Sequence, residues 1–413
     1  MSISRRDFLK TSVAMVPTLA MMPAVFRRSV AAALLESPAA ASSNRTLIVV
    51  QMAGGNDPLN TLVPYGDGRY YDLRPDLAIP EDLILPLDRE VGLHSSLADL
   101  KTLWDQGMLA IVEGVGYPRP NYSHFSSMDI WQSADPEAKL KHGWLGRYFE
   151  MLESTQGVFA GLTAGNRTAP ELFSATVPVP VVPNIARYQL QGDPRFPEAA
   201  DARAEALLNL YAASPSQAPY SMLLDTTINA AQRSSLALQQ ADQDYTQMAD
   251  YPDTRLANAL KVLAEAIVGD LGVKVGHVTI GGFDTHATQA GPQADLLREV
   301  SGAVRAFYED IKAHGKDRDV VVMTWSEFGR RARSNASNGT DHGDAGLQFI
   351  LGTPVKGGLY GERPDLGNLD NDNLRFTTDF RSVYATVLEQ WLGAPAEAVL
   401  GNQRFETLPF LTA

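Results

Sequence analysis

Acidic residues and histidines follow several apolar runs of the sequence, at the points where β-strands are expected to end. The residues concerned are Asp57, the pair Asp284 and His286, Glu327, and the pair Asp341 and His342. In a mainly parallel sheet, functional side chains gather beyond the carboxyl ends of the strands. Carboxylate oxygens and neutral imidazole nitrogens bind divalent cations such as zinc, manganese and calcium. The sequence therefore predicts a metal site built from these six residues.

Each of these groups has a structural alternative when it is taken alone. Asp57 could cap a helix, and Asp284 could belong to a capped turn that leaves His286 in solvent. Glu327 could form an ion pair with the arginines that follow it, and the pair Asp341-His342 could be an ordinary loop feature. The occurrence of four such groups after apolar runs favours a shared metal site.

Alternating apolar runs and amphipathic segments predict an α/β fold with a mainly parallel sheet. The predicted strands cover residues 45–51, 108–115, 274–281, 319–324 and 347–351. The predicted helices cover residues 94–107, 256–270, 293–314 and 380–391, and a further helix is capped by Ser123. The order strand, helix, strand, helix at the start of the chain favours right-handed parallel connections.

The region from about residue 143 to residue 252 has a different character. Several prolines interrupt it, and two stretches rich in Ala, Leu and Gln predict helices over residues 199–213 and 225–248. We interpret this region as a helical and loop insertion, or lid, in a single α/β domain that spans residues 42–413.

Composition excludes several classes of function. The 413-residue chain has 35 Lys and Arg against 48 Asp and Glu, a net charge of -13, which argues against a nucleic-acid partner. The chain contains no cysteine, so disulfides, thiolate catalysis and iron–sulfur clusters are excluded. Metal chemistry must then use histidine and oxygen ligands.

The first 41 residues predict an export signal. Arg5 and Arg6, followed by Phe8, Leu9 and Lys10, resemble a twin-arginine signal peptide. The apolar stretch that follows is short and interrupted by two prolines, which is unfavourable for a membrane span. We expect residues 1–41 to be removed, leaving a periplasmic or secreted protein with no membrane span.

Six motifs carry a resemblance to a known family. They are Gly54-Gly55-Asn56-Asp57, Asn121-Tyr122-Ser123-His124-Phe125, Gly143-Trp144-Leu145-Gly146-Arg147, Gly282-Phe283-Asp284-Thr285-His286, Ser326-Glu327-Phe328-Gly329-Arg330 and Asp341-His342-Gly343. Together they resemble the twin-arginine-exported bacterial family of unknown function numbered 1501, over nearly all of the mature chain. That family is grouped with the alkaline phosphatase and sulfatase superfamily. The resemblance therefore implies an alkaline-phosphatase-like three-layer α/β sandwich with metal ligands at strand ends.

The same resemblance implies roles for individual residues. Ser123 stands where the superfamily has its nucleophilic Ser or Thr, at a helix start that favours an alkoxide. The positions that resemble metal ligands are Asp57, Asp284, His286, Glu327 and His342. The sequence departs from the superfamily pattern in the two-residue spacing of its Asp-His pair and in the phenylalanine that follows the strand-end glutamate. It also lacks the Cys or Ser frame of formylglycine sulfatases.

Two functional hypotheses follow. The first is an exported metal-dependent hydrolase of a phosphate or sulfate ester, acting on a small-molecule or glycan substrate, with a serine or an activated water as nucleophile. Its catalytic residues are Ser123 and Arg330, and its substrate-binding residues are Asn56, Asn60, His124 and Arg331. The second is a non-catalytic exported protein with a degenerate metal site, which serves stability or an envelope partner. A nucleotide-dependent enzyme is not favoured, because no phosphate-loop frame is present.

Overall fold

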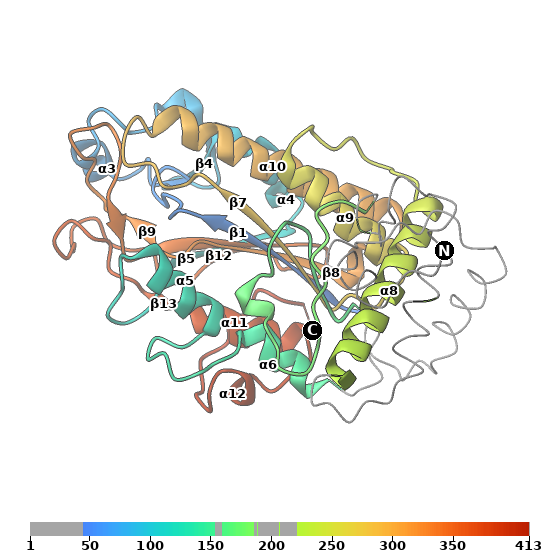
Figure 1. The fold of residues 1–413 in the computed structure, drawn as a ribbon. Coiled ribbons are helices and arrows are strands. Elements are labelled where there is room, and N and C mark those ends of the chain that lie inside the picture. The colour runs from blue at the N-terminus through green and yellow to red at the C-terminus, as the bar shows by residue number, and fades with distance from the viewer. Residues whose placement is uncertain (1–43, 153–158, 186–187, 189–205, 207–220, 413) are drawn as a thin grey trace, which may run out of the picture.

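A computed structural model describes residues 44–152, 159–185, 188, 206 and 221–412 of the chain. Its central feature is an eight-stranded sheet that lies between two layers of helices (Figure 1). The strands of this sheet are β1 (Thr46–Ala53), β5 (Leu109–Gly116), β6 (Gly161–Thr163), β7 (Val275–Gly281), β8 (Val320–Trp325), β11 (Gly346–Leu351), β12 (Gly358–Tyr360) and β13 (Thr378–Asp379).

Helices of different lengths connect and cover these strands. The α-helices are α3 (Gly68–Leu73), α4 (Ala98–Asp105), α5 (His124–Ser133), α6 (Trp144–Met151), α8 (Ser221–Asp244), α9 (Arg255–Val268), α10 (Ala290–Ala313), α11 (Phe380–Thr386) and α12 (Ala396–Val399). Short 3₁₀ turns lie at Glu81–Leu83, Ser95–Leu97, Pro170–Leu172 and Asp317–Asp319, and a π-helical turn at Val387–Trp391 extends α11.

The strand order across the sheet is β12-β5-β11-β8-β1-β7-β6, and β13 pairs with the end of β5. Neighbouring strands are parallel except at β11, which runs antiparallel to both β5 and β8. In the centre, Val50 of β1 lies opposite Val278 of β7 and Thr324 of β8. The carboxyl ends of β1, β7 and β8 therefore meet at the same edge of the sheet.

The alternation of side chains along β1 divides the hydrophobic core into two parts. Ile48, Val50 and Met52 belong to a cluster shared with α4, α9 and α10 on one face of the sheet. Leu47 and Val49 belong to a second cluster shared with α5, α6 and α11 on the other face. All five side chains are buried, as expected for a strand covered on both faces. Figure 1 shows the resulting three layers.

Two small sheets lie outside the main one. β2 (Leu62–Val63), β4 (Gly92–His94) and β3 (Ile84–Pro86) form an antiparallel sheet in the order β2-β4-β3. β9 (Gly329–Arg330) and β10 (His342–Gly343) form an antiparallel pair that follows β8, in which His342 lies opposite Arg330. The pairing of β9 with β10 places His342 close to the carboxyl end of β8.

The predicted α/β fold with a mainly parallel sheet is confirmed, and strands occur in all five predicted regions. The antiparallel direction of β11 did not follow from the sequence pattern. It arises because only a hairpin and its loop separate β11 from β8, whereas a parallel partner needs a crossover connection, usually a helix. β6, from the predicted insertion, adds an edge strand to the main sheet beside β7.

Some predicted segments are only partly described or lie outside the described residues. The second predicted helix of the insertion is observed as α8. The first, over residues 199–213, lies outside the described residues except for residue 206, and the predicted signal of residues 1–41 lies outside them entirely. Within the described part of the chain, no helix has the length and apolar character that crossing a membrane requires.

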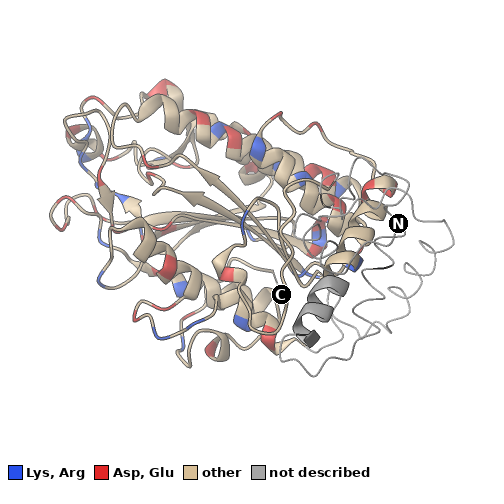
Figure 2. Ribbon diagram, viewed as in Figure 1, with Lys and Arg blue, Asp and Glu red and all other residues tan. Residues whose placement is uncertain are grey.

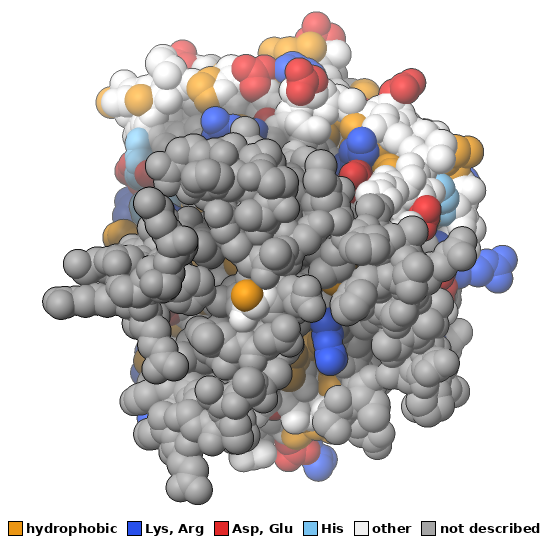
Figure 3. All heavy atoms as spheres, turned by 45° about the vertical axis from the view of Figure 1, so that its right-hand side comes forward, with side chains coloured by type: hydrophobic (Ala, Val, Ile, Leu, Met, Phe, Trp, Pro, Cys, Tyr) orange, Lys and Arg blue, Asp and Glu red, His pale blue; other side chains and the backbone are white. Residues whose placement is uncertain are grey.

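Charged residues lie mainly on the outer helices and loops, while the central strands carry few (Figure 2). On the face shown in Figure 3, the described surface along the upper rim mixes acidic and basic side chains. Glu265 of α9 is an exception to this outer placement, since the residue is only 5% exposed. Burial, together with the nearby charges of Asp242 and Asp310, raises the pKa of Glu265 to about 7, although Lys261 opposes the shift.

We predict that Glu265→Gln flattens the pH dependence of stability. The pKa of the folded state lies above the ordinary value of 4.5, so the stabilising contribution of the protonated carboxyl is complete below pH 4.5 and is lost as the pH rises through 7. Across this pH window, the unfolding free energy of the wild type should fall by on the order of 2 kcal/mol more than that of the variant. Urea denaturation at pH 5 and pH 8 measures the difference. Glu309→Gln, at a partly exposed ion pair with Arg305 on α10, is the control that should leave the wild-type slope intact.

Candidate metal centre

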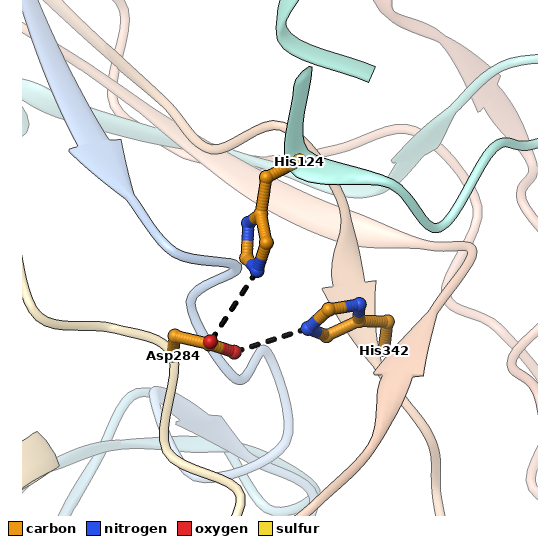
Figure 4. A group of neighbouring side chains, drawn as sticks. All are labelled: His124, Asp284 and His342. Atoms are coloured by element: carbon orange, nitrogen blue, oxygen red, sulfur yellow. Dashed lines mark hydrogen bonds and ion pairs between the residues drawn. The ribbon is translucent and has the colours of Figure 1, made fainter. Parts of the chain in front are cut away.

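Three side chains from different elements converge at the carboxyl edge of the sheet. His124 is the first residue of α5, Asp284 follows β7, and His342 lies in β10 (Figure 4). One ligand atom of each lies within 4.8 Å of those of the other two. The Asp284 carboxylate lies between the two rings, with Oδ2 3.4 Å from His124 Nε2 and Oδ1 3.0 Å from His342 Nε2.

A backbone carbonyl sets the protonation of His342. His342 Nδ1 lies 2.8 Å from the carbonyl oxygen of Tyr122, which can only accept a hydrogen bond, so the proton of the neutral ring is on Nδ1. Burial lowers the pKa of His342, which favours the neutral ring at neutral pH. Nε2 then directs a lone pair at the Asp284 carboxylate.

His124 has a corresponding partner for its second nitrogen. His124 Nδ1 lies 2.8 Å from Oε1 of Glu327, whose side chain is fully buried. The Glu327 carboxylate also accepts a hydrogen bond from the backbone N–H of Gly54, at 2.9 Å to Oε1 and 3.1 Å to Oε2. The structure therefore places Glu327 behind His124, on the side away from Asp284.

His286 lies at the outer side of this group. Its Nε2 is 2.9 Å from His342 Nε2 and 3.0 Å from Asp284 Oδ1, while its Nδ1 is 3.2 Å from Asp341 Oδ1. The side chains of His286 and Asp341 are 44% and 51% exposed, so both are open to solvent, as is that of Asp284 at 46%. Asp341 thus contacts Nδ1 of His286, as Glu327 contacts Nδ1 of His124.

The side chains present fit a divalent cation. Burial acts to raise the pKa of Asp284, but in acid, where His342 is protonated, hydrogen bonds from His342 and Arg330 prevail and lower this pKa to about 2, so the carboxylate is ionised at neutral pH. An ionised carboxylate therefore faces imidazole lone pairs at about hydrogen-bond distance. A cation bound among them would relieve this repulsion, and imidazole with carboxylate is a donor set used by zinc and manganese.

Arg330 is fully buried, and all parts of its guanidinium are engaged. It donates to the carbonyl oxygens of Gly54 and Phe283, and to Asp284 Oδ1 at 2.9 Å. Two further bonds reach the carbonyl oxygens of Gly55, at 2.7 Å, and Thr340, at 2.8 Å. Arg330 thus fixes Asp284 and joins the ends of β1 and β7 to the loop before β10.

The glycine pair after β1 is required by close packing. Gly54 and Gly55 have φ values of 122° and 83°, in the range that favours glycine. A Cβ on Gly54 would lie within 3 Å of the backbone at Asp284, and one on Gly55 would lie within 3 Å of the Phe328 ring. The motif therefore lets the β1 turn approach the residues that hold the centre.

Asp57 lies in a different cluster, beneath the loop that follows β1. Its two carboxylate oxygens accept from Arg74, at 2.6 and 3.0 Å, and both side chains are fully buried. Gln289 donates to the same carboxylate, and Asn60 accepts from Arg74 at 2.6 Å. The structure does not bring Asp57 to the three converging ligands.

The remaining predicted residues have separate environments. Ser123 is exposed, caps the start of α5 by position, and makes no side-chain hydrogen bond to the helix. Asn56 faces the Asp57 cluster, where its Oδ1 accepts from Thr61 at 3.1 Å. Arg331 is partly buried, and its Nε has no hydrogen-bond partner among the described residues.

From the sequence we expected His124 to bind the substrate, whereas the structure places it among the three side chains that converge as candidate metal ligands. We also did not expect Arg74 and Gln289, the partners of Asp57. His124 directly follows the helix-capping Ser123 in the motif that carries the resemblance, which was the available signal. No periodic pattern marks Arg74, since it lies just beyond the six-residue helix α3.

We predict that Asp57→Asn destabilises the fold and leaves metal binding intact. Removing one charge of a buried ion pair costs about 3 kcal/mol or more, because the Arg74 charge then stays buried without its counter-ion. Chemical denaturation and the metal content per folded molecule test the two halves of this statement. Asp365→Asn, at an exposed pair with Arg69, should change stability by less than about 0.5 kcal/mol. Loss of metal from folded Asp57→Asn protein would show instead that this carboxylate is a ligand.

Comparison with known proteins gives a family and distant structural likenesses. No curated protein matches the sequence. A sulfatase, PsFucS1 from Pseudoalteromonas sp., is similar over 94% of this chain and 75% of its own, at 11% identity and a TM-score of 0.41. The C-terminal periplasmic domain of EcEptC from Escherichia coli, in complex with Zn, is similar over 77% and 74%, at 12% identity and a TM-score of 0.36. The lipoteichoic acid synthase LtaP from Listeria monocytogenes is similar over 86% and 81%, at 10% identity and a TM-score of 0.35.

Structural likeness at these scores carries no argument about the activity of this chain. The family assignment is firmer, because a single family model matches residues 110–403, which is more than half of the sequence and includes His124, Asp284 and His342. The chain therefore belongs to the protein family of unknown function DUF1501.

Proposed function

We propose that this protein is an exported metal-dependent hydrolase of a phosphate or sulfate ester. The observation that carries the proposal is the convergence of His124 Nε2, His342 Nε2 and the Asp284 carboxylate on one point at the carboxyl edge of the sheet. Three protein ligands with a further position open to solvent are typical of catalytic metal sites. The partial exposure of His124 and Asp284 supports access from solvent.

The donor set favours zinc or manganese over calcium. Imidazole nitrogen suits the first two ions, whereas calcium prefers six to eight oxygen ligands. His124, Asp284 and His342 would hold the divalent cation, which would polarise the ester as a Lewis acid and stabilise the charge that develops on its oxygens. Arg330 holds Asp284 in place through their 2.9 Å bond, so its role is to position a ligand.

Ser123 is the proposed nucleophile. Its hydroxyl is exposed, caps no backbone N–H, and lies next to His124 in sequence at the start of α5. The positive end of the helix dipole favours the serine alkoxide and an anionic substrate oxygen at this position. Arg331, which follows Arg330 directly and is only partly buried, is the proposed group for holding a further anionic oxygen.

Export places the substrate outside the cytoplasm. The proposed twin-arginine signal of residues 1–41 directs the protein to the periplasm or the medium, where small-molecule and glycan esters are the substrates that we propose. The net charge of -13 is unfavourable for a nucleic-acid substrate.

A second candidate function is a non-catalytic protein whose metal stabilises the fold. The observation that favours it is His286, whose Nε2 lies 3.0 Å from Asp284 Oδ1 and 2.9 Å from His342 Nε2. With His286 as a fourth ligand, the centre would be closed, as structural zinc sites are. Chelation would then lower thermal stability, and no ester would be hydrolysed.

We predict that Asp284→Ala and His342→Ala each abolish metal binding and ester hydrolysis. Removing one of three ligands eliminates the charge or nitrogen that the ion requires, and turnover should fall by at least 100-fold. Elemental analysis of the purified mature protein, with hydrolysis of p-nitrophenyl phosphate and p-nitrophenyl sulfate, provides the measurements. His314→Gln, at the end of α10, is a histidine control that should retain both properties.

The outcomes separate the two candidate functions. Metal in the wild type together with hydrolysis that is lost in both ligand variants supports the hydrolase. Metal without hydrolysis of either ester, and a melting temperature that falls on chelation, supports the structural site. Hydrolysis that persists in folded Asp284→Ala protein contradicts the proposed mechanism.

A further inference from the structure

Glu327 makes an unusual set of contacts for a residue expected to bind metal. It follows β8 directly, and its side chain is fully buried. Both carboxylate oxygens accept from the backbone N–H of Gly54, and Oε1 also lies 2.8 Å from His124 Nδ1. The Glu327 carboxylate therefore contacts Nδ1 of His124, whereas Asp284 faces Nε2 on the opposite side of the ring.

These contacts determine which nitrogen of His124 carries the proton. The Gly54 N–H is a donor that both oxygens accept, so the Glu327 carboxylate acts as an acceptor. His124 Nδ1 must then donate, which leaves a lone pair on Nε2, 3.4 Å from Asp284 Oδ2. A carboxylate behind a ligating imidazole fixes the ring's tautomer and orientation and makes the ligating nitrogen more basic.

The other two imidazoles of the site show the same arrangement with different acceptors. The carbonyl oxygen of Tyr122 accepts from His342 Nδ1, and Asp341 lies behind His286. Asp341 is half exposed, whereas Glu327 is shielded from water. The hydrogen bond to Glu327 is therefore the less screened of the two carboxylate contacts.

We propose that Glu327 is a positioning residue for the metal centre and not one of its ligands. It holds the Nδ1-H tautomer of His124, orients Nε2 toward Asp284, and places a second negative charge close to the ion. Through Gly54 it also joins the turn after β1 to the start of α5. This inference rests on the metal centre of the proposed function, and it changes the role that the sequence indicated for Glu327.

Glu327→Gln tests the proposal at nearly constant volume. A glutamine removes the negative charge and replaces one acceptor oxygen with an NH2 donor, so its hydrogen bond to His124 Nδ1 is weaker and its amide can turn a donor toward the ring instead. We expect the dissociation constant for zinc, measured by competition with a chromophoric chelator, to rise about 10- to 100-fold. Glu113→Gln replaces another buried carboxylate, which pairs with Arg363, and should leave zinc affinity unchanged.

A spectroscopic measurement separates positioning from a general effect on folding. Long-range ¹H–¹⁵N correlation spectra of the metal-free protein distinguish the two tautomers of each histidine. In Glu327→Gln, the signals of His124 should lose the pure Nδ1-H pattern, while His342, held by the Tyr122 carbonyl, should keep its own. Glu327→Asp keeps the charge but shortens the side chain, and we expect an intermediate zinc affinity; it also serves as the test variant if Glu327→Gln does not fold.

The results test the positioning role of Glu327 and the proposed function separately. Wild-type zinc affinity in the folded Glu327 variants, or an unchanged His124 tautomer, overturns the positioning role. Zinc binding that is abolished in Glu327→Asp as completely as in Asp284→Ala identifies Glu327 as a ligand and also overturns it. A wild type that binds neither zinc nor manganese contradicts the proposed function, while the tautomer of His124 still tests the contact with Glu327.

Discussion

The buried guanidinium of Arg330 is the interaction on which the arrangement of the site depends. A charge removed from water must be matched by acceptors, and this one has four backbone carbonyls and the Asp284 carboxylate. Those acceptors belong to the turn after β1, the end of β7 and the loop before β10. Asp284 is contacted directly, and His342 follows two residues after Thr340, so the geometry of both depends on this one side chain.

The segment from Ser326 to Arg330 shows how the end of β8 organises the site. Ser326 Oγ accepts from the N–H of Asn56 at 2.9 Å and so holds the turn after β1. Phe328 packs against Gly55 and lies 4.3 Å, between ring centroids, from His342. Four of the five residues in this segment thus contact, in order, the β1 turn, the His124 ring, the His342 ring and the Asp284 carboxylate. In the sequence, residues 326–330 resembled a metal-binding motif interrupted by Phe328. In the structure, the side chains of this segment hold the residues around the candidate metal centre in place.

The sequence predicted the main strands and helices because their apolar periodicity is local information. It also placed Asp284 and His342 at strand ends, and the structure brings these side chains together, although their binding of metal remains a prediction. Contacts between distant segments could not be predicted in the same way. Asp57 was expected at the metal because its position after β1 is suggestive, but Arg74, 17 residues later, engages its carboxylate. The ligand position of His124 depends on how α5 packs against β8, which no local pattern encodes.

In the arrangement that we propose, His124, Asp284 and His342 hold one cation, while Glu327 and Asp57 do not touch it. The most direct test is a crystal structure of the zinc-loaded protein with anomalous diffraction data collected on both sides of the zinc absorption edge. We predict an anomalous peak about 2.0–2.2 Å from His124 Nε2, His342 Nε2 and an Asp284 oxygen. A loaded crystal with no peak at this position, or with a peak bonded to Glu327 or Asp57, would contradict the claim.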